Sequence, residues 1–160
     1  MLQFRESLGV EAKVVPGVSA VFSAPLLGGI PVTHRGCANQ VVLSTGYGKD
    51  LSVPVRLQPY HQEQTAVYLM AVGRIKELCD RLQTEAGYPR DCPAALVERA
   101  STPQQRVVSG TVGTLASIAE QLQVKPPATI VFGSVVTVLN GAHEGCVPAY
   151  TVLTAAASES

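Results

Sequence analysis

Apolar residues gather in short runs along the chain, separated by polar stretches that contain glycine or proline. This pattern is typical of buried strands that alternate with helices. The apolar run at 65–70 is followed, after Gly73, by apolar side chains at helical spacing, which predicts a helix with one buried face. The side chains on that face are Ile75, Leu78, Cys79 and Leu82. The alternation of strands and helices predicts an α/β fold.

Five strands are predicted from their apolar and β-branched composition. In chain order they cover residues 40–44, 65–70, 94–98, 105–109 and 129–133. Only six residues separate the third strand from the fourth, too few for the crossover that parallel neighbours need. These two strands are therefore predicted to pair as an antiparallel hairpin around residues 101–103. The sequence thus predicts a mixed five-stranded sheet flanked by helices.

Two further helices and two short extended segments complete the predicted elements. The helices cover residues 19–27 and 111–122, and the extended segments cover residues 12–15 and 135–139. Ser19 is suited to cap the first of these helices, because its hydroxyl can accept a hydrogen bond from a free backbone N–H. Pro126 and Pro127 end the second, since proline does not continue a helix.

The composition excludes several classes of function. At 160 residues and 46% hydrophobic, the chain is long enough for one compact α/β domain, or for one lobe with a fragment of another. Twelve basic and twelve acidic side chains balance, so no strong field attracts nucleic acid or an acidic membrane. No apolar stretch reaches the roughly 20 residues of a bilayer span, and the first residues lack a signal-peptide pattern. The chain is predicted to be soluble and cytoplasmic.

Metal and disulfide chemistry are not expected. The four cysteines lie far apart, without the close pairs of zinc sites or redox motifs. They are Cys37, Cys79, Cys92 and Cys146. His61 and His143 sit in loops without companion ligands, so no metal site is assigned.

Polar clusters at the ends of predicted strands are the best candidates for a site, because ligands of α/β folds collect at such loops. One cluster reads VPGVSA at 15–20 and GIPVTHR at 29–35. Further along, 65–70 ends in Met70, and residues 93–110 contain PAALVERA and TPQQRVVSG. PATIVFGSVV follows at 127–136. In order and spacing, these segments resemble the uroporphyrinogen-III C-methyltransferases of the tetrapyrrole (corrin) methylase superfamily.

The resemblance implies a tetrapyrrole-methylase-like fold of which this chain is the C-terminal part. Residues 1–35 would be the remnant of the N-terminal lobe and the segment between lobes. Residues 36–153 would be the C-terminal lobe, and 154–160 a disordered tail. The first strand of the family and its Gly-Gly-Asp-type loop, which holds the methionine end of the cofactor, have no counterpart here, and Ala71 stands where the family usually has glycine.

The resemblance also implies an activity. This is the S-adenosyl-L-methionine-dependent C-methylation of uroporphyrinogen III to precorrin-2, in sirohaem or corrinoid biosynthesis, by a homodimer. Carried over by position, the cofactor contacts are Ser19, Ala20, Met70, Ala100, Ala128 and Thr129. Arg35 is assigned to the carboxylates of the tetrapyrrole, which it suits as a bidentate donor, and His34 to the same substrate. No catalytic residue is assigned, because methyl transfer from a sulfonium chiefly needs positioning and exclusion of water.

Other interpretations stay open at this point. The chain is also consistent with a non-catalytic lobe for dimerisation or cofactor binding, because half of a two-lobe cleft does not preorganise a transition state. A related precorrin methylase or a diphthine synthase is a third hypothesis, although residues 33–35 and 105–108 favour the uroporphyrinogen type. Taken alone, a methionine at a strand end is most often a core residue, and an arginine after a turn a solvated charge. Apolar surface left by a missing lobe predicts self-association.

Overall fold

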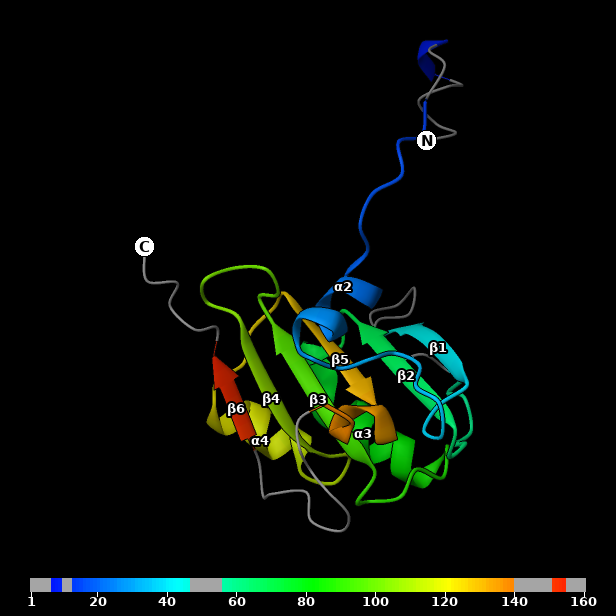
Figure 1. The fold of residues 1–160 in the computed structure, drawn as a ribbon, viewed down its shortest axis with the longest axis vertical. Coiled ribbons are helices and arrows are strands. Elements are labelled where there is room, and N and C mark those ends of the chain that lie inside the picture. The colour runs from blue at the N-terminus through cyan, green and yellow to red at the C-terminus, as the bar shows by residue number, and fades with distance from the viewer. Residues whose placement is uncertain (1–6, 10–12, 47–55, 140–150, 155–160) are drawn as a thin grey trace.

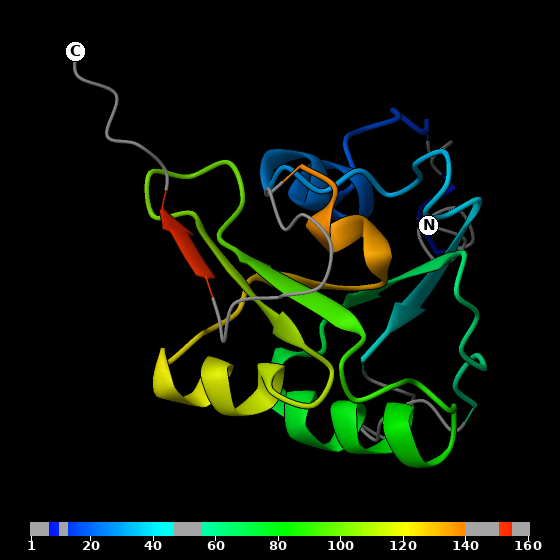
Figure 2. The same cartoon turned by 60° about the horizontal axis from the view of Figure 1, so that its bottom comes forward.

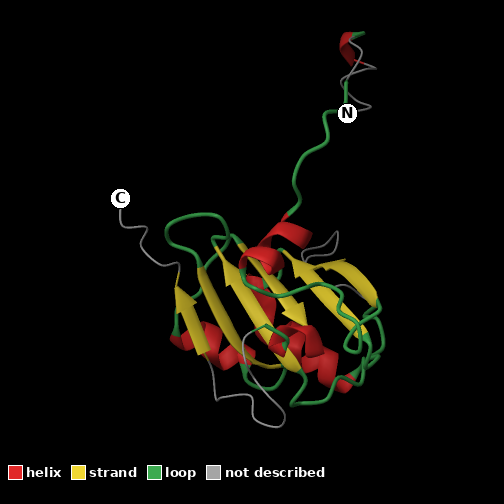
Figure 3. Cartoon of the chain, in the orientation of Figure 1, coloured by secondary structure: helices red, strands yellow, loops and turns green. Residues whose placement is uncertain are grey.

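The computed structural model describes residues 7–9, 13–46, 56–139 and 151–154. Its elements form three layers, with a sheet between two layers of helices (Figures 1 and 3). In chain order they are α2 (Ala20–Leu27), β1 (Gln40–Thr45), β2 (Gln64–Leu69), η1 (Val72–Arg74), α3 (Ile75–Thr84), β3 (Pro93–Glu98), β4 (Arg106–Thr111), α4 (Leu115–Gln121), β5 (Ala128–Phe132), η2 (Ser134–Thr137) and β6 (Thr151–Thr154). The α/β class predicted from the sequence is confirmed.

The sheet is mixed, as predicted. Its strand order is β1-β2-β5-β3-β4-β6, and β1 runs parallel to β2, whereas all other neighbours are antiparallel. The five predicted strands are all present, and β3 and β4 form the predicted hairpin. The sequence did not predict the short edge strand β6, which pairs with β4. The proposed tail at 154–160 lies outside the described residues except for Thr154, the last residue of β6.

Helices α3 and α4 lie side by side under one face of the sheet (Figure 2). The four side chains predicted to form the inner face of α3 are all buried, with at most 8% of their surface exposed. They pack on a cluster that also contains Leu96, Ile130 and Phe132 from the sheet. Burial of such a cluster is the main source of stability in a domain of this size.

Helix α2 and the 3-10 helix η2 cover the opposite face. Residues 135–139 were predicted to extend the sheet, and this prediction is wrong for the stretch that forms η2. Gly133 explains the difference, since its φ of 134° ends β5, and a Cβ there would lie 2.8 Å from the carbonyl oxygen of Gln64. The chain therefore turns back over the sheet instead of continuing in it.

Two other predicted boundaries need correction. Helix α4 begins at Leu115, not at residue 111, because Thr111 still pairs with Pro93 in the sheet. The described part of the predicted strand at 12–15 is not a strand, and residues 13–18 lead away from the sheet as an extended, exposed segment (Figure 1). Ala12 itself lies outside the described residues.

The outer surface near α2 is unusually apolar. Val18 is 90% exposed, Phe22 59% and Leu26 72%. Exposed apolar side chains grouped in this way are typical of a surface that contacts another body. Self-association of the chain remains a prediction, to be checked by the sedimentation of the purified protein at increasing concentration.

We expect Cys79 and Cys92 to resist alkylation in the native protein, whereas Cys37 reacts. Both resistant thiols are nearly fully buried, and burial raises the pKa of each to about 12, so the reactive thiolate is scarce at pH 8. Cys37 is only partly buried. Site-resolved mass spectrometry after iodoacetamide treatment should show the two buried thiols modified on the order of tenfold more slowly, or slower still. Equal rates in the folded chain would contradict this packing.

Candidate functional site

A cavity of about 470 Å³ opens at the edge of the sheet where β2 ends and β5 begins. These two strands are antiparallel neighbours, and Leu69 near the end of β2 pairs with Thr129 near the start of β5. The end of one strand and the start of the other therefore meet at the same edge. The first residue of α2, Ala20, also lines the cavity.

Four of the six residues predicted to contact a cofactor surround this cavity. They are Ala20, Met70, Ala128 and Thr129. Met70 is 62% exposed, so the alternative of a methionine in the hydrophobic core does not apply. Thr129 is buried, and Ala128 is half-buried in the cavity wall. The structure thus brings these residues, which are far apart in the sequence, to one place.

The backbone at Met70 adopts a left-handed conformation, with φ of 55°. Residues with side chains rarely do so, and such positions gather at functional sites. The neighbouring packing fixes it, because Gly46 N–H donates to the carbonyl oxygen of Leu69 at 2.6 Å. A Cβ on Gly46 would lie 2.3 Å from the Cα of Ala71, so only glycine fits there. The end of β1 thereby positions Met70 at the cavity.

No cofactor contact was predicted from the sequence for the remaining residues of the cavity wall. These are Leu69, Val72, Gly73, Pro126 and Pro127. Each one stands within three residues of an identified position, so extending every predicted contact along the chain would have found them. Among the described residues the wall is almost wholly apolar, and Thr129 supplies the one side-chain hydroxyl of this set. Such a wall suits a flat, weakly polar group that makes its hydrogen bonds to backbone atoms.

Ser19 and Ala100 have other surroundings in the structure. The Ser19 hydroxyl accepts a hydrogen bond from Val21 N–H at 3.4 Å and caps α2, as predicted. Ala100 packs against the core cluster beneath α2. Neither residue lines the cavity, although Ser19 directly precedes Ala20, which does.

His34 and Arg35, the predicted substrate contacts, lie together in a second hollow of about 490 Å³. Both side chains are exposed. A backbone bridge between His34 and Ala38 forms the tight turn that carries them. Asn39 donates to Glu63 at 2.6 Å across the same hollow, which ties the turn to the start of β2. This hollow and the apolar cavity share no lining residue among those described.

The structure contains no candidate metal centre in its described ranges, where no three His, Cys, Asp or Glu side chains gather. Within the same ranges, no helix has both the length and the apolar character needed to cross a bilayer.

Comparison with known proteins gives a consistent result. Residues 1–116 match the sequence profile of the family described as Tetrapyrrole (Corrin/Porphyrin) Methylases. A siroheme synthase of Pseudoalteromonas atlantica is 38% identical over 133 residues, which is 81% of this chain and 28% of that protein. A probable uroporphyrinogen-III C-methyltransferase of Schizosaccharomyces pombe is 37% identical over 125 residues, which is 78% of this chain and 25% of that protein.

Solved structures share the fold. Uroporphyrin-III C-methyltransferase of Thermus thermophilus superposes with a TM-score of 0.71 and 35% identity, over 86% of this chain and 57% of that one. The same enzyme complexed with S-adenosyl homocysteine gives a TM-score of 0.72 and 34% identity, with the same coverage. The chain therefore spans about a quarter of the length of these curated relatives, and somewhat more than half of the solved enzyme.

Proposed function

This chain belongs to the tetrapyrrole (corrin/porphyrin) methylase family, and on that premise we propose that it is the C-terminal part of a uroporphyrinogen-III C-methyltransferase. Its role in that enzyme is to hold S-adenosyl-L-methionine for the C-methylation that yields precorrin-2, on the route to sirohaem or corrinoids. The single observation that carries this proposal is the apolar cavity at the sheet edge where β2 ends and β5 begins, around which Ala20, Met70, Ala128 and Thr129 meet.

The residues present fit the adenosyl part of this donor. Ala20 and Ala128 leave room for an aromatic base to approach the backbone, and Met70 offers a soft, polarizable wall. The Thr129 hydroxyl is placed to bond a polar edge of the base or the ribose. When bound, the donor supplies an electrophilic methyl group on a sulfonium. The chain contributes position and exclusion of water, which are the main requirements of such a transfer.

The tetrapyrrole is assigned to the second hollow. Arg35 presents a guanidinium that binds carboxylate in a bidentate fork, and the proposed substrate carries many carboxylates. His34 orients one of them from the same turn. A homodimer as the working unit, with the apolar surface of α2 in an interface, is part of this proposal.

Narrowing the cavity is expected to weaken binding of the product analogue S-adenosylhomocysteine. Ala128→Leu adds three carbon atoms to the wall, where the base would lie, and the affinity should fall by roughly tenfold or more. Isothermal titration calorimetry on the purified chain measures this. Gln121→Leu, an equally apolar replacement at an exposed end of α4, is the matched control and should leave the affinity unchanged.

Circular dichroism of both variants shows whether the fold is kept. Absence of binding by the folded wild-type chain would overturn the proposed donor site. Binding without methyl transfer to uroporphyrinogen III would support the alternative that the chain alone is a cofactor-binding lobe. An affinity that falls equally in both variants would also contradict this placement of the donor.

A further inference from the structure

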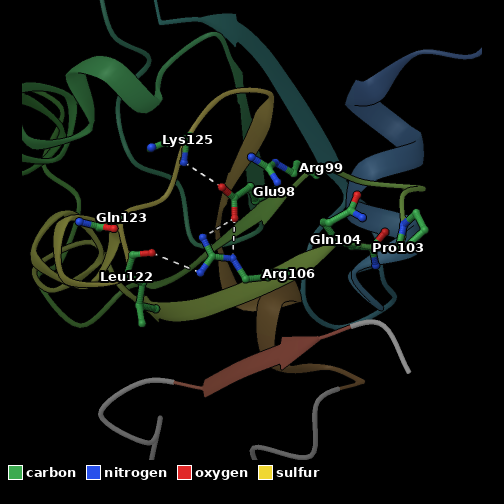
Figure 4. A pocket seen from close by; sticks show the side chains of 9 residues that line it. Glu98, Arg99, Pro103, Gln104, Arg106, Leu122, Gln123 and Lys125 are labelled. Atoms are coloured by element: carbon green, nitrogen blue, oxygen red, sulfur yellow. Dashed lines mark hydrogen bonds and ion pairs between the residues drawn. The ribbon is translucent and has the colours of Figure 1, made fainter. Parts of the chain in front are cut away.

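A third cavity, of about 470 Å³, lies where β3 ends and β4 begins, and the proposed function does not use it. Figure 4 shows Glu98 at its centre, between Arg106 and the backbone of Lys125, with Arg99 and Gln104 on the opposite side. Among the residues that the structure describes, three cationic side chains and one carboxylate line it, so this part of the lining carries net positive charge.

The carboxylate of Glu98 already has partners within the protein. Glu98 is only 3% exposed, and Arg106 Nε donates to its Oε2 at 2.6 Å, while Arg106 Nη2 forms an ion pair with the same oxygen at 2.6 Å. Its Oε1 accepts from Lys125 N–H at 2.8 Å. Arg106 also donates to the carbonyl oxygen of Leu122 at 3.2 Å. The two opposite charges of this partly buried pair therefore cancel, and the carboxylate oxygens of Glu98 both have hydrogen-bond partners.

The side chains of Arg99 and Lys125 have no ion-pair or hydrogen-bond partner among the described residues, and both are exposed at the cavity. The amide groups of Gln104 and Gln123 add neutral donors to the same lining. Two unpaired cations beside amide donors attract an anion with more than one negative charge.

The rim of the cavity is held in a rigid, unusual conformation. Arg99, Ser101 and Gln123 have φ of 48°, 68° and 50°, and they are three of the four non-glycine residues with positive φ in the described ranges. A side chain makes this backbone conformation unfavourable, so it persists only where its surroundings fix it. Here the Gln105 side chain accepts from Ser101 N–H at 2.9 Å and donates to the carbonyl oxygen of Leu27 at 3.0 Å.

We infer that this cavity is a binding site for a multiply charged anion, either a polycarboxylate or a phosphate-bearing molecule. Arg99 and Lys125 supply the charge, and Gln104 and Gln123 supply further donors. The site is distinct from the apolar cavity. The two are neighbours, because Lys125 lines one and the following Pro126 and Pro127 line the other.

Titration calorimetry of the full chain with citrate, and separately with pyrophosphate, tests this inference. We expect saturable binding of at least one of them, with roughly tenfold weaker affinity in Arg99→Gln and in Lys125→Gln. Binding of citrate alone would identify a polycarboxylate site, and of pyrophosphate alone a phosphate site. Because both variants change exposed side chains, they should keep the circular dichroism spectrum of the parent.

Lys76→Gln removes the same charge from an exposed position on α3 and is the control. Saturable binding that this control weakens as much as Lys125→Gln would show general electrostatic attraction and overturn the site. No saturable binding of either anion would overturn it as well. Since S-adenosylhomocysteine is absent from these titrations, their outcome is independent of the proposed donor site.

Discussion

Replacing Phe132 with alanine is expected to lower the free energy of unfolding by about 3 to 5 kcal/mol. Phe132 ends β5, the strand that joins the two sides of the sheet, and its side chain is fully buried. Its ring packs edge-to-face against Tyr68 and Tyr88, with distances between ring centroids of 5.7 Å and 6.3 Å. Truncation removes both ring contacts and leaves a void that this tightly packed cluster closes only in part.

Urea unfolding followed by circular dichroism measures the effect. Phe22→Ala is the matched control, because the same ring is 59% exposed on α2 and its loss should change stability by less than about 1 kcal/mol. If Phe132→Ala does not fold, Phe132→Leu provides a smaller loss of volume at the same position. Equal stability changes at positions 132 and 22 would contradict the packing of this core.

Arg106→Met is expected to destabilise the fold by about 2 to 4 kcal/mol. The replacement leaves the Glu98 carboxylate buried, with Lys125 N–H as its one remaining partner in the described structure. A buried charge without its counter-ion is more costly than the pair is favourable. The expected loss of stability is smaller than for a fully buried ion pair, because the Arg106 side chain is 29% exposed and water reaches it.

Two further variants separate the cost of leaving Glu98 without its counter-ion from the cost of removing any arginine side chain. Arg74→Met breaks an exposed pair with Glu77 on α3, and should cost no more than about 0.5 kcal/mol. Adding Glu98→Gln to Arg106→Met removes the stranded charge while an amide oxygen remains for Lys125 N–H, so the double variant should be more stable than Arg106→Met alone. A double variant that is less stable than the single one would show that the buried charge is not the cause.

The spacing of hydrophobic residues in the sequence was sufficient to locate the helices and strands that bury a continuous face. The i, i+3, i+4 and i+7 spacing located α3, and short apolar runs located β2, β3 and β5, because burial against the sheet demands those patterns. Strand β6 has no such requirement, since a short edge strand is defined by the neighbour that it pairs with. The 3-10 helix η2 was missed for a similar reason, because the turn at Gly133 follows from its contact with Gln64.

The candidate site was predicted only in part. Four of six proposed cofactor contacts meet at one cavity because strand ends gather at a sheet edge, which the sequence order already implied. The left-handed backbone of Met70 was not predictable, since it depends on the close approach of Gly46, the residue that follows β1. The cavity around Arg99 and Lys125 could not be predicted from the sequence either. It forms where the β3–β4 hairpin loop meets the segment after α4, and these two segments are apart in the sequence.

The position of β5 also constrains how the chain is made. It follows β1 to β4 in the sequence, yet it lies between β2 and β3, which belong to two strand pairs encoded before it, β1–β2 and β3–β4. During synthesis, β1–β2 and β3–β4 emerge first, and each exposes an unpaired edge until residues 128–132 arrive. Open edges of this kind recruit strands from other chains. A chain cut off before residue 128 would lack the strand that pairs with both of these edges and is therefore expected to aggregate.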